Sequence, residues 1–158
     1  MRIYYSLARE RHVRFPDGLE SALERLARLE QDLDTGDPPC PCHNDLLAGN
    51  FIDDGKRLWL IDWDYAGFNS PLFDLGNLSS NNEVAPADEK WLLETYFERP
   101  LNVELNRRYH AMKCASLLRE TMWSMVSEVH STIDFDYAAY TADYLGRFER
   151  AFAALKTI

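Results

Sequence analysis

The chain has 158 residues, of which 46% are hydrophobic and 27% charged, proportions typical of a globular protein with a core of its own. It carries 17 Lys and Arg against 26 Asp and Glu, a formal net charge of −9, which argues against non-specific nucleic-acid binding because that requires a cationic surface. No apolar run approaches the ~18 residues of a membrane span, and the first residues lack a signal-peptide core. We therefore expect one cytoplasmic domain over residues 1–158, with no nucleic-acid and no membrane partner.

The first predicted element is an amphipathic helix that begins at Leu19. Residues 1–16 are mixed, with no repeating apolar pattern. From Leu19 to Leu33, leucines recur every three or four residues, and charged residues occupy the opposite face. The Gly- and Pro-containing segment 34–39 ends this helix. We expect it to serve as scaffold.

The three cysteines follow no disulfide or metal pattern. Cys40, Cys42 and Cys114 are an odd and sparse set, which suits a reducing compartment. Cys40 and Cys42 precede His43, but a structural zinc site needs about four ligands, and the other histidines lie far away in the sequence. We interpret the cysteines as buried, inert thiols.

A β-hairpin is predicted after the loop 41–50. The apolar runs 51–52 and 58–61 flank an Asp-Asp-Gly-Lys turn, which is a good hairpin signal. Because a hairpin brings its open ends together, Asn50 and Asp62 are expected to lie side by side.

Helices account for the rest of the chain. We expect a short helix near residues 73–78 and longer ones over residues 86–97, 103–129 and 135–155. The predicted fold class is therefore mainly α with a small β-hairpin.

Three polar residues around the hairpin have the spacing of a phosphoryl-transfer site. His43, Asp45 and Asn50 follow the order His-x-Asp-x-x-x-x-Asn, and Asp62 ends the second strand. In the protein-kinase fold, this arrangement supplies a catalytic base and two ligands of Mg²⁺. We predict Asp45 as the base for a substrate hydroxyl, and Asn50 and Asp62 as the Mg²⁺ ligands, because Mg²⁺ prefers hard oxygen donors.

Three neighbouring residues are assigned supporting roles. Asp64 would point the same way as Asp62 along an extended segment, so we count it as a further metal or substrate-binding candidate. We interpret His43 as a buried residue that holds the loop through hydrogen bonds. Asp74 is expected to bond the backbone of the same loop.

The sequence resembles the choline/ethanolamine kinase family, within the wider aminoglycoside-phosphotransferase-like group. Three blocks carry the resemblance, at residues 43–50, 60–69 and 73–77. The resemblance implies the C-terminal lobe of a protein-kinase-like fold, ATP as cosubstrate, Mg²⁺, and a small cationic alcohol as substrate, choline first.

The resemblance continues in an aromatic segment near the C-terminus. Trp123, Tyr137 and Tyr140 are similar to the residues with which choline kinases enclose the trimethylammonium group. Aromatic faces suit a quaternary ammonium, because such a group cannot donate hydrogen bonds and is attracted by cation–π interaction. Their helical spacing would equally suit residues of the core, and both interpretations stay open here.

Only the C-terminal lobe of that family is covered. No Gly-rich loop and no run of strands precedes Asp45, so we expect the N-terminal nucleotide-binding lobe to be absent from residues 1–158. The chain alone is then expected to be weakly active or inactive. Two alternatives are a non-catalytic or truncated domain that binds a small cation or a protein partner, and a kinase of an aminoglycoside or thiamine. Apolar surface left exposed without that lobe predicts a homodimer.

Overall fold

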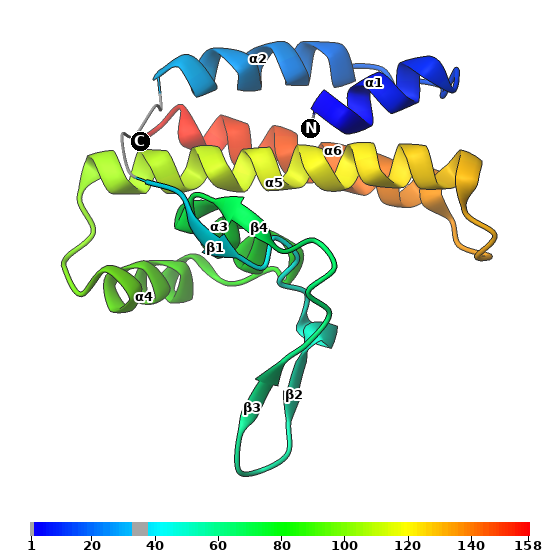
Figure 1. Ribbon diagram of the computed structural model, residues 1–158. Helices are drawn as coiled ribbons and strands as arrows, with labels where there is room; N and C mark the ends of the chain where they lie inside the picture. Colours follow the sequence, from blue (N-terminus) through cyan, green and yellow to red (C-terminus); the bar gives the residue numbers. More distant parts are fainter. Residues whose placement is uncertain (1, 33–37) are drawn as a thin grey trace. The chain divides into compact units, whose positions relative to one another are not determined.

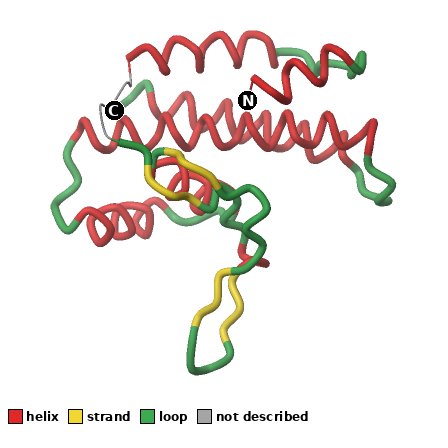
Figure 2. Tube along the Cα trace, in the orientation of Figure 1, coloured by secondary structure: helices red, strands yellow, loops and turns green. Residues whose placement is uncertain are grey.

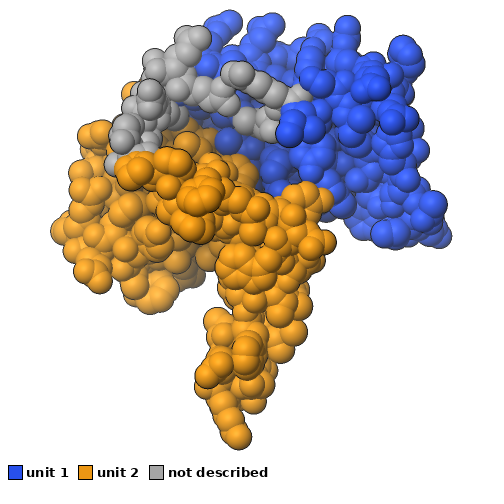
Figure 3. Space-filling view, in the orientation of Figure 1, with its two compact units in different colours: residues 1–34, 114–157 blue, residues 35–113, 158 orange. Residues whose placement is uncertain are grey.

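The computed structural model describes residues 2–32 and 38–158, which form helices and two short antiparallel sheets (Figures 1 and 2). The chain divides into two compact units (Figure 3), one made of residues 1–34 and 114–157 and the other of residues 35–113 and 158. Within the described residues, no helix combines the length and apolar character needed to cross a membrane. The single-domain organisation of residues 1–158 stays a prediction.

The unit of residues 35–113 carries all the described strands. In chain order its elements are β1 (Cys40–Cys42), a 3₁₀ turn (Ala48–Asn50), β2 (Phe51–Asp53), β3 (Leu58–Leu60), β4 (Gly67–Asn69), α3 (Pro71–Asn81), α4 (Pro86–Phe97) and the first part of α5 (Val103–His130). β2 pairs with β3, and β1 pairs with β4, so the second sheet joins the two ends of the segment that contains the hairpin. A buried cluster of apolar residues holds α3, α4 and α5 together, and consists of Leu72, Leu75, Leu93, Leu105 and Tyr109.

The other unit is entirely helical in its described part. It contains α1 (Arg2–Glu10), α2 (Leu19–Asp32), the later part of α5 and α6 (Tyr137–Leu155). Arg25 of α2 forms an ion pair with Glu149 of α6, and its guanidinium lies 4.8 Å from the centre of the Phe152 ring. Asp136 begins α6, because its side chain accepts a hydrogen bond from the Ala139 amide.

The hairpin forms where it was predicted. Phe51 pairs with Leu60 and Asp53 with Leu58. Asp53 accepts a 2.8 Å hydrogen bond from the amide of Gly55, which has a φ of +78° that glycine adopts without strain. The hairpin extends away from α3 and α4 of its own unit (Figure 2).

Most helices were predicted correctly, and the errors have physical causes. The helices at residues 86–97 and 103–130 match the prediction, whereas α3 is longer than the predicted 73–78 because Ser70 caps it and Pro71 starts it. α1 was missed, since nine residues give too few turns for a clear period. β1 and β4 were not predicted, because each has three residues and is stabilised by a partner far along the chain. Leu33 and the predicted helix end after it fall outside the described residues.

Gly76 allows α3 and α5 to approach closely. A Cβ atom at this position would lie 2.8 Å from the Lys113 nitrogen and 3.0 Å from the Lys113 Cα. Both contacts are with backbone, which cannot rotate away. The sequence therefore needs glycine here for packing, not for its backbone conformation.

Gly76→Ala is expected to destabilise the protein by about 1–3 kcal/mol, because α3 and α5 must move apart. Gly146→Ala is the matched control, since Gly146 is also helical and its added Cβ would meet only the end of the Arg150 side chain, at 3.5 Å. That control should be neutral or stabilising by up to about 1 kcal/mol. Urea unfolding measures both, and equal stability of the two variants would contradict the packing argument.

Candidate active site

The backbone of the loop that follows β1 is held by the side chain of Asp74. This carboxylate, on α3, accepts 2.7 Å hydrogen bonds from the amides of His43 and Asn44. Asn44 needs such support, because its φ of +64° lies in the left-handed region. The role predicted for Asp74 is confirmed, although the residue is only partly buried.

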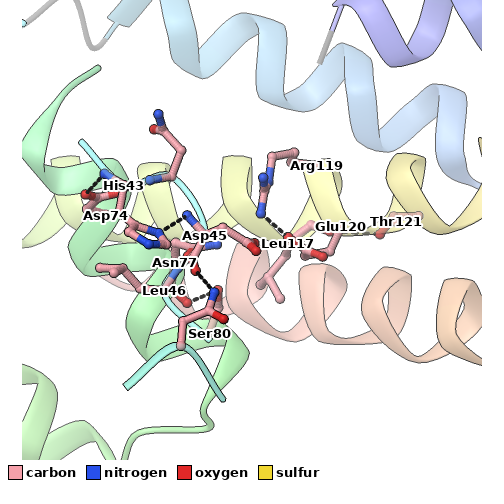
Figure 4. Close-up of polar contacts among 12 residues, drawn as sticks. His43, Asp45, Leu46, Asp74, Asn77, Ser80, Leu117, Arg119, Glu120 and Thr121 are labelled. Carbon is pink, nitrogen blue, oxygen red and sulfur yellow. Dashed lines mark hydrogen bonds and ion pairs between the residues drawn. The ribbon is translucent and has the colours of Figure 1, made fainter. Parts of the chain in front are cut away.

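Two asparagines complete this attachment farther along the loop. Asn77 is fully buried, and its Oδ1 accepts a 2.5 Å hydrogen bond from the Leu46 amide. Asn82, at the end of α3, accepts from the Ala48 amide and donates to the Leu46 carbonyl. Figure 4 shows Asp74 and Asn77 beside the loop. One face of α3 thus fixes the loop backbone at four amides.

His43 is a buried support of the loop, as predicted. Its side chain is 2% exposed. The Asp45 amide donates to its Nδ1 at 3.3 Å, so Nδ1 is the acceptor nitrogen, and Nε2–H donates to the Ile61 carbonyl at 2.9 Å. The ring also meets Trp63 edge to face, with centroids 4.7 Å apart. His43 therefore connects the loop to the residues that directly follow β3, at the open end of the hairpin.

Asn50 connects three parts of the candidate site. Its Nδ2 donates a 2.9 Å hydrogen bond to the Asp45 carbonyl, so its amide oxygen is the atom suited to bind a cation. Its own carbonyl accepts from the Ile61 amide at 3.0 Å, next to Asp62. Asn50 is thereby bonded to the backbone of Asp45 and to the residue before Asp62.

Asp62 and Asp64 are exposed, and the chain between them is not extended. Asp62 has a φ of +61°, and the Ala66 amide donates to the Trp63 carbonyl to close a turn. The alternation that would point Asp62 and Asp64 the same way does not apply to such a turn, so that argument was wrong. The choice of Asp64 as a site residue stays a prediction.

Trp123, Phe135, Tyr137 and Tyr140 form an aromatic cluster. The Trp123 ring lies 6.0 Å from Tyr137 and 5.9 Å from Tyr140, and Phe135 lies 5.0 Å and 5.7 Å from the same two rings. All four contacts are edge to face. Tyr137 is buried, Trp123 and Tyr140 are partly exposed, and Phe135 is half exposed.

Cys42 and Cys114 are buried, as expected, whereas Cys40 is only partly buried. The Cys40 and Cys42 sulfurs lie 3.7 Å apart, both thiols are free, and no group of three or more His, Cys, Asp or Glu able to hold a metal occurs among residues 2–32 and 38–158. Burial, with the nearby Asp74 carboxylate, raises the pKa of the Cys42 thiol to about 12. Cys42 is therefore protonated near neutral pH, as expected of an inert thiol.

Sequence reasoning missed the parts of the site that act through backbone bonds. Asn77 lies in the third block of the resemblance, and its burial could not be read from a short helical pattern. Asn82 lies beyond the predicted end of that helix. Phe135 was assigned no role from the sequence, and its ring contacts Tyr137 and Tyr140.

Asn77→Ala should lower the free energy of unfolding by about 1–3 kcal/mol, because the Leu46 amide loses its buried acceptor. Amide hydrogen exchange at Leu46 should accelerate more than exchange in α5. Asn106→Ala, at a partly buried position on α5, is the control and should change stability by less than about 0.5 kcal/mol. Unchanged protection of Leu46 in Asn77→Ala would show that the loop does not depend on this bond.

Comparisons with known proteins agree with this geometry. The phosphotransferase enzyme family matches residues 4–112. LicA from Haemophilus influenzae is 31% identical over 124 residues, which cover 75% of this chain and 44% of LicA. Human ethanolamine kinase 2 is 35% identical over 140 residues, which cover 75% of this chain and 36% of that protein.

The fold has a close counterpart among solved structures. A choline/ethanolamine kinase family protein from Mesorhizobium loti superposes with a TM-score of 0.78 at 28% identity, covering 95% of this chain and 52% of that one. The chain thus spans about half of this structure and less than half of the two curated relatives. The predicted fold class, a kinase-like C-terminal lobe, is confirmed. The chain belongs to the phosphotransferase enzyme family, and its relatives there are choline and ethanolamine kinases.

Proposed function

We propose that this chain supplies the catalytic half of a kinase that transfers the γ-phosphate of ATP to the hydroxyl of a small amino alcohol, choline first. One observation carries the proposal: Asn50 is bonded to the Asp45 carbonyl on one side and to the Ile61 amide, next to Asp62, on the other. Phosphoryl transfer asks the protein mainly for positioning and for neutralisation of charge. A loop fixed at four amides meets the first requirement.

The residue roles follow from the donor atoms present. Asp45 accepts the proton of the substrate hydroxyl and orients that hydroxyl toward the phosphate. The amide oxygen of Asn50 and the carboxylate of Asp62 would hold Mg²⁺, which prefers such oxygen ligands and would neutralise phosphate charge. Asp64 would assist from the turn that follows. The buried, doubly bonded His43 keeps the loop in shape and takes no proton from the substrate.

The aromatic cluster supports a cationic head group on the substrate. Its partly exposed rings, Trp123 and Tyr140, can attract a quaternary ammonium by cation–π interaction, which requires no hydrogen bond from the ligand. The proposal therefore assigns Trp123, Tyr137 and Tyr140 to substrate binding. The relatives named as ethanolamine kinase 2 and as a choline/ethanolamine kinase family protein favour an amino alcohol over an aminoglycoside or thiamine.

A second candidate is a non-catalytic domain that binds a small cation or a protein partner. This candidate is favoured because the chain covers less than half of its relatives, 44% of LicA and 36% of ethanolamine kinase 2. We propose that a nucleotide-binding lobe outside residues 1–158 is needed for full activity. Exposed apolar residues of the hairpin region would pack against such a lobe or against a second copy of the chain in a homodimer; examples are Leu58 (64% exposed), Trp63 (53%) and Phe68 (77%).

Transfer of labelled phosphate from ATP tests the function directly. The 158-residue chain alone should form little phosphocholine with Mg²⁺. The same chain fused to the nucleotide-binding lobe of the Mesorhizobium loti relative should form it readily, and Asp45→Asn should then reduce the rate by about 10²–10⁴-fold. A fusion that phosphorylates aminoglycosides or thiamine but not choline or ethanolamine would contradict the proposed substrate class.

Asp62→Asn should weaken binding of Mn²⁺, used as a paramagnetic substitute for Mg²⁺, by about tenfold or more, because the amide carries no charge. In the wild-type chain, Mn²⁺ should broaden the NMR amide signals of Asn50 and Asp62 before others. Asp53→Asn makes the same charge change at an exposed position of the hairpin and is the matched control. Equal Mn²⁺ affinity of the two variants would show that Asp62 is not a ligand of the metal.

A further inference from the structure

A buried carboxylate lies at one edge of the aromatic cluster. Glu120 is 5% exposed and precedes Trp123 by one helical turn on α5. The Tyr140 hydroxyl donates to its Oε2 at 3.4 Å. Since the Trp123 ring also faces Tyr140, Glu120 and Trp123 approach the same tyrosine from one face of the helix. None of the roles assigned above uses this carboxylate.

The two carboxylate oxygens of Glu120 have different neighbours, a cation on one side and the aromatic cluster on the other. Its Oε1 pairs with the guanidinium of Arg119, drawn as a dashed line in Figure 4, and both side chains are nearly buried, at 12% and 6% exposure. The ion pair compensates for the cost of burying the carboxylate. The other oxygen, Oε2, is the one turned toward Tyr140. The cluster therefore meets the negative end of this pair.

Tyr140 remains a neutral phenol in this setting. Burial, a hydrogen bond with Tyr144 and the charge of Glu120 all raise the pKa of its hydroxyl. The Tyr140 ring stacks on Tyr144 with centroids 4.3 Å apart, which fixes its plane. Tyr140 thus presents an uncharged aromatic face to the cluster and its hydroxyl to Glu120.

We infer that Glu120 gives the aromatic cluster its preference for a positively charged head group over a neutral one of the same shape. Aromatic faces alone bury a neutral tert-butyl group well, because most of that gain comes from apolar area. A carboxylate at the edge of the cluster attracts only the charged ligand, and the low dielectric of a buried site strengthens that attraction. The inference rests on the proposed function of the cluster in binding the substrate head group.

Binding of choline and of 3,3-dimethyl-1-butanol, its neutral counterpart, tests this on the 158-residue chain without nucleotide. Isothermal titration gives both dissociation constants, and the selectivity ratio is the dissociation constant of the neutral alcohol divided by that of choline. The wild-type chain should favour choline, and Glu120→Gln, which keeps the size and an acceptor for Tyr140, should reduce that ratio by about tenfold. Glu128→Gln removes a charge from an exposed position of the same helix and should leave the ratio unchanged.

The possible results separate the inference from the function on which it rests. Equal weakening of both ligands in Glu120→Gln would make Glu120 a structural residue and overturn the inference, while leaving the cluster as the binding site. Failure of the wild-type chain to bind either ligand would overturn the cluster's assignment as well. If Glu120→Gln does not fold, Arg119→Gln serves instead: loss of the guanidinium should raise the ratio, and an unchanged or lower ratio would overturn the inference.

Discussion

The candidate site depends on hydrogen bonds between side chains of α3 and the backbone of the loop that follows β1. The Asp74 carboxylate accepts hydrogen bonds from the amides of His43 and Asn44. The Asn77 side chain accepts one from the amide of Leu46. These three bonds are made to backbone amides and do not use the Asp45 side chain, and the side chains of His43 and Asn50 add further bonds within the same segment.

Hydrogen bonds also attach the loop to the residue that follows β3, Ile61. His43 bonds the Ile61 carbonyl and Asn50 bonds the Ile61 amide, so one residue of the hairpin is held through both of its backbone groups. Asp62 follows immediately, in a left-handed conformation that aspartate adopts only at some cost. The surrounding bonds offset that cost. An unfavourable backbone conformation at a predicted metal ligand is the kind of local strain that functional sites retain.

Sequence patterns predicted those parts of the fold that depend on local order. The helix at residues 86–97 has Pro86 and two acidic residues in its first turn, the helix at residues 103–130 is long, and the hairpin has a strong turn signal. The β1–β4 sheet could not be predicted, because its stability comes from pairing over 27 residues and not from either three-residue strand. For the site, spacing identified Asp45, Asn50 and Asp62 as candidates, but the roles of Asn77, Asn82 and Glu120 depend on tertiary contacts that no spacing encodes. The error about Asp62 and Asp64 arose because a turn replaces the extended segment that was assumed.

The proposed magnesium site for phosphoryl transfer is formed by the loop and the hairpin together. Anomalous diffraction from crystals of this chain soaked in Mn²⁺ tests it most directly. A Mn²⁺ peak is expected about 2.0–2.3 Å from both the amide oxygen of Asn50 and a carboxylate oxygen of Asp62. A Mn²⁺ ion bound elsewhere on the chain, with neither residue as a ligand, would contradict it.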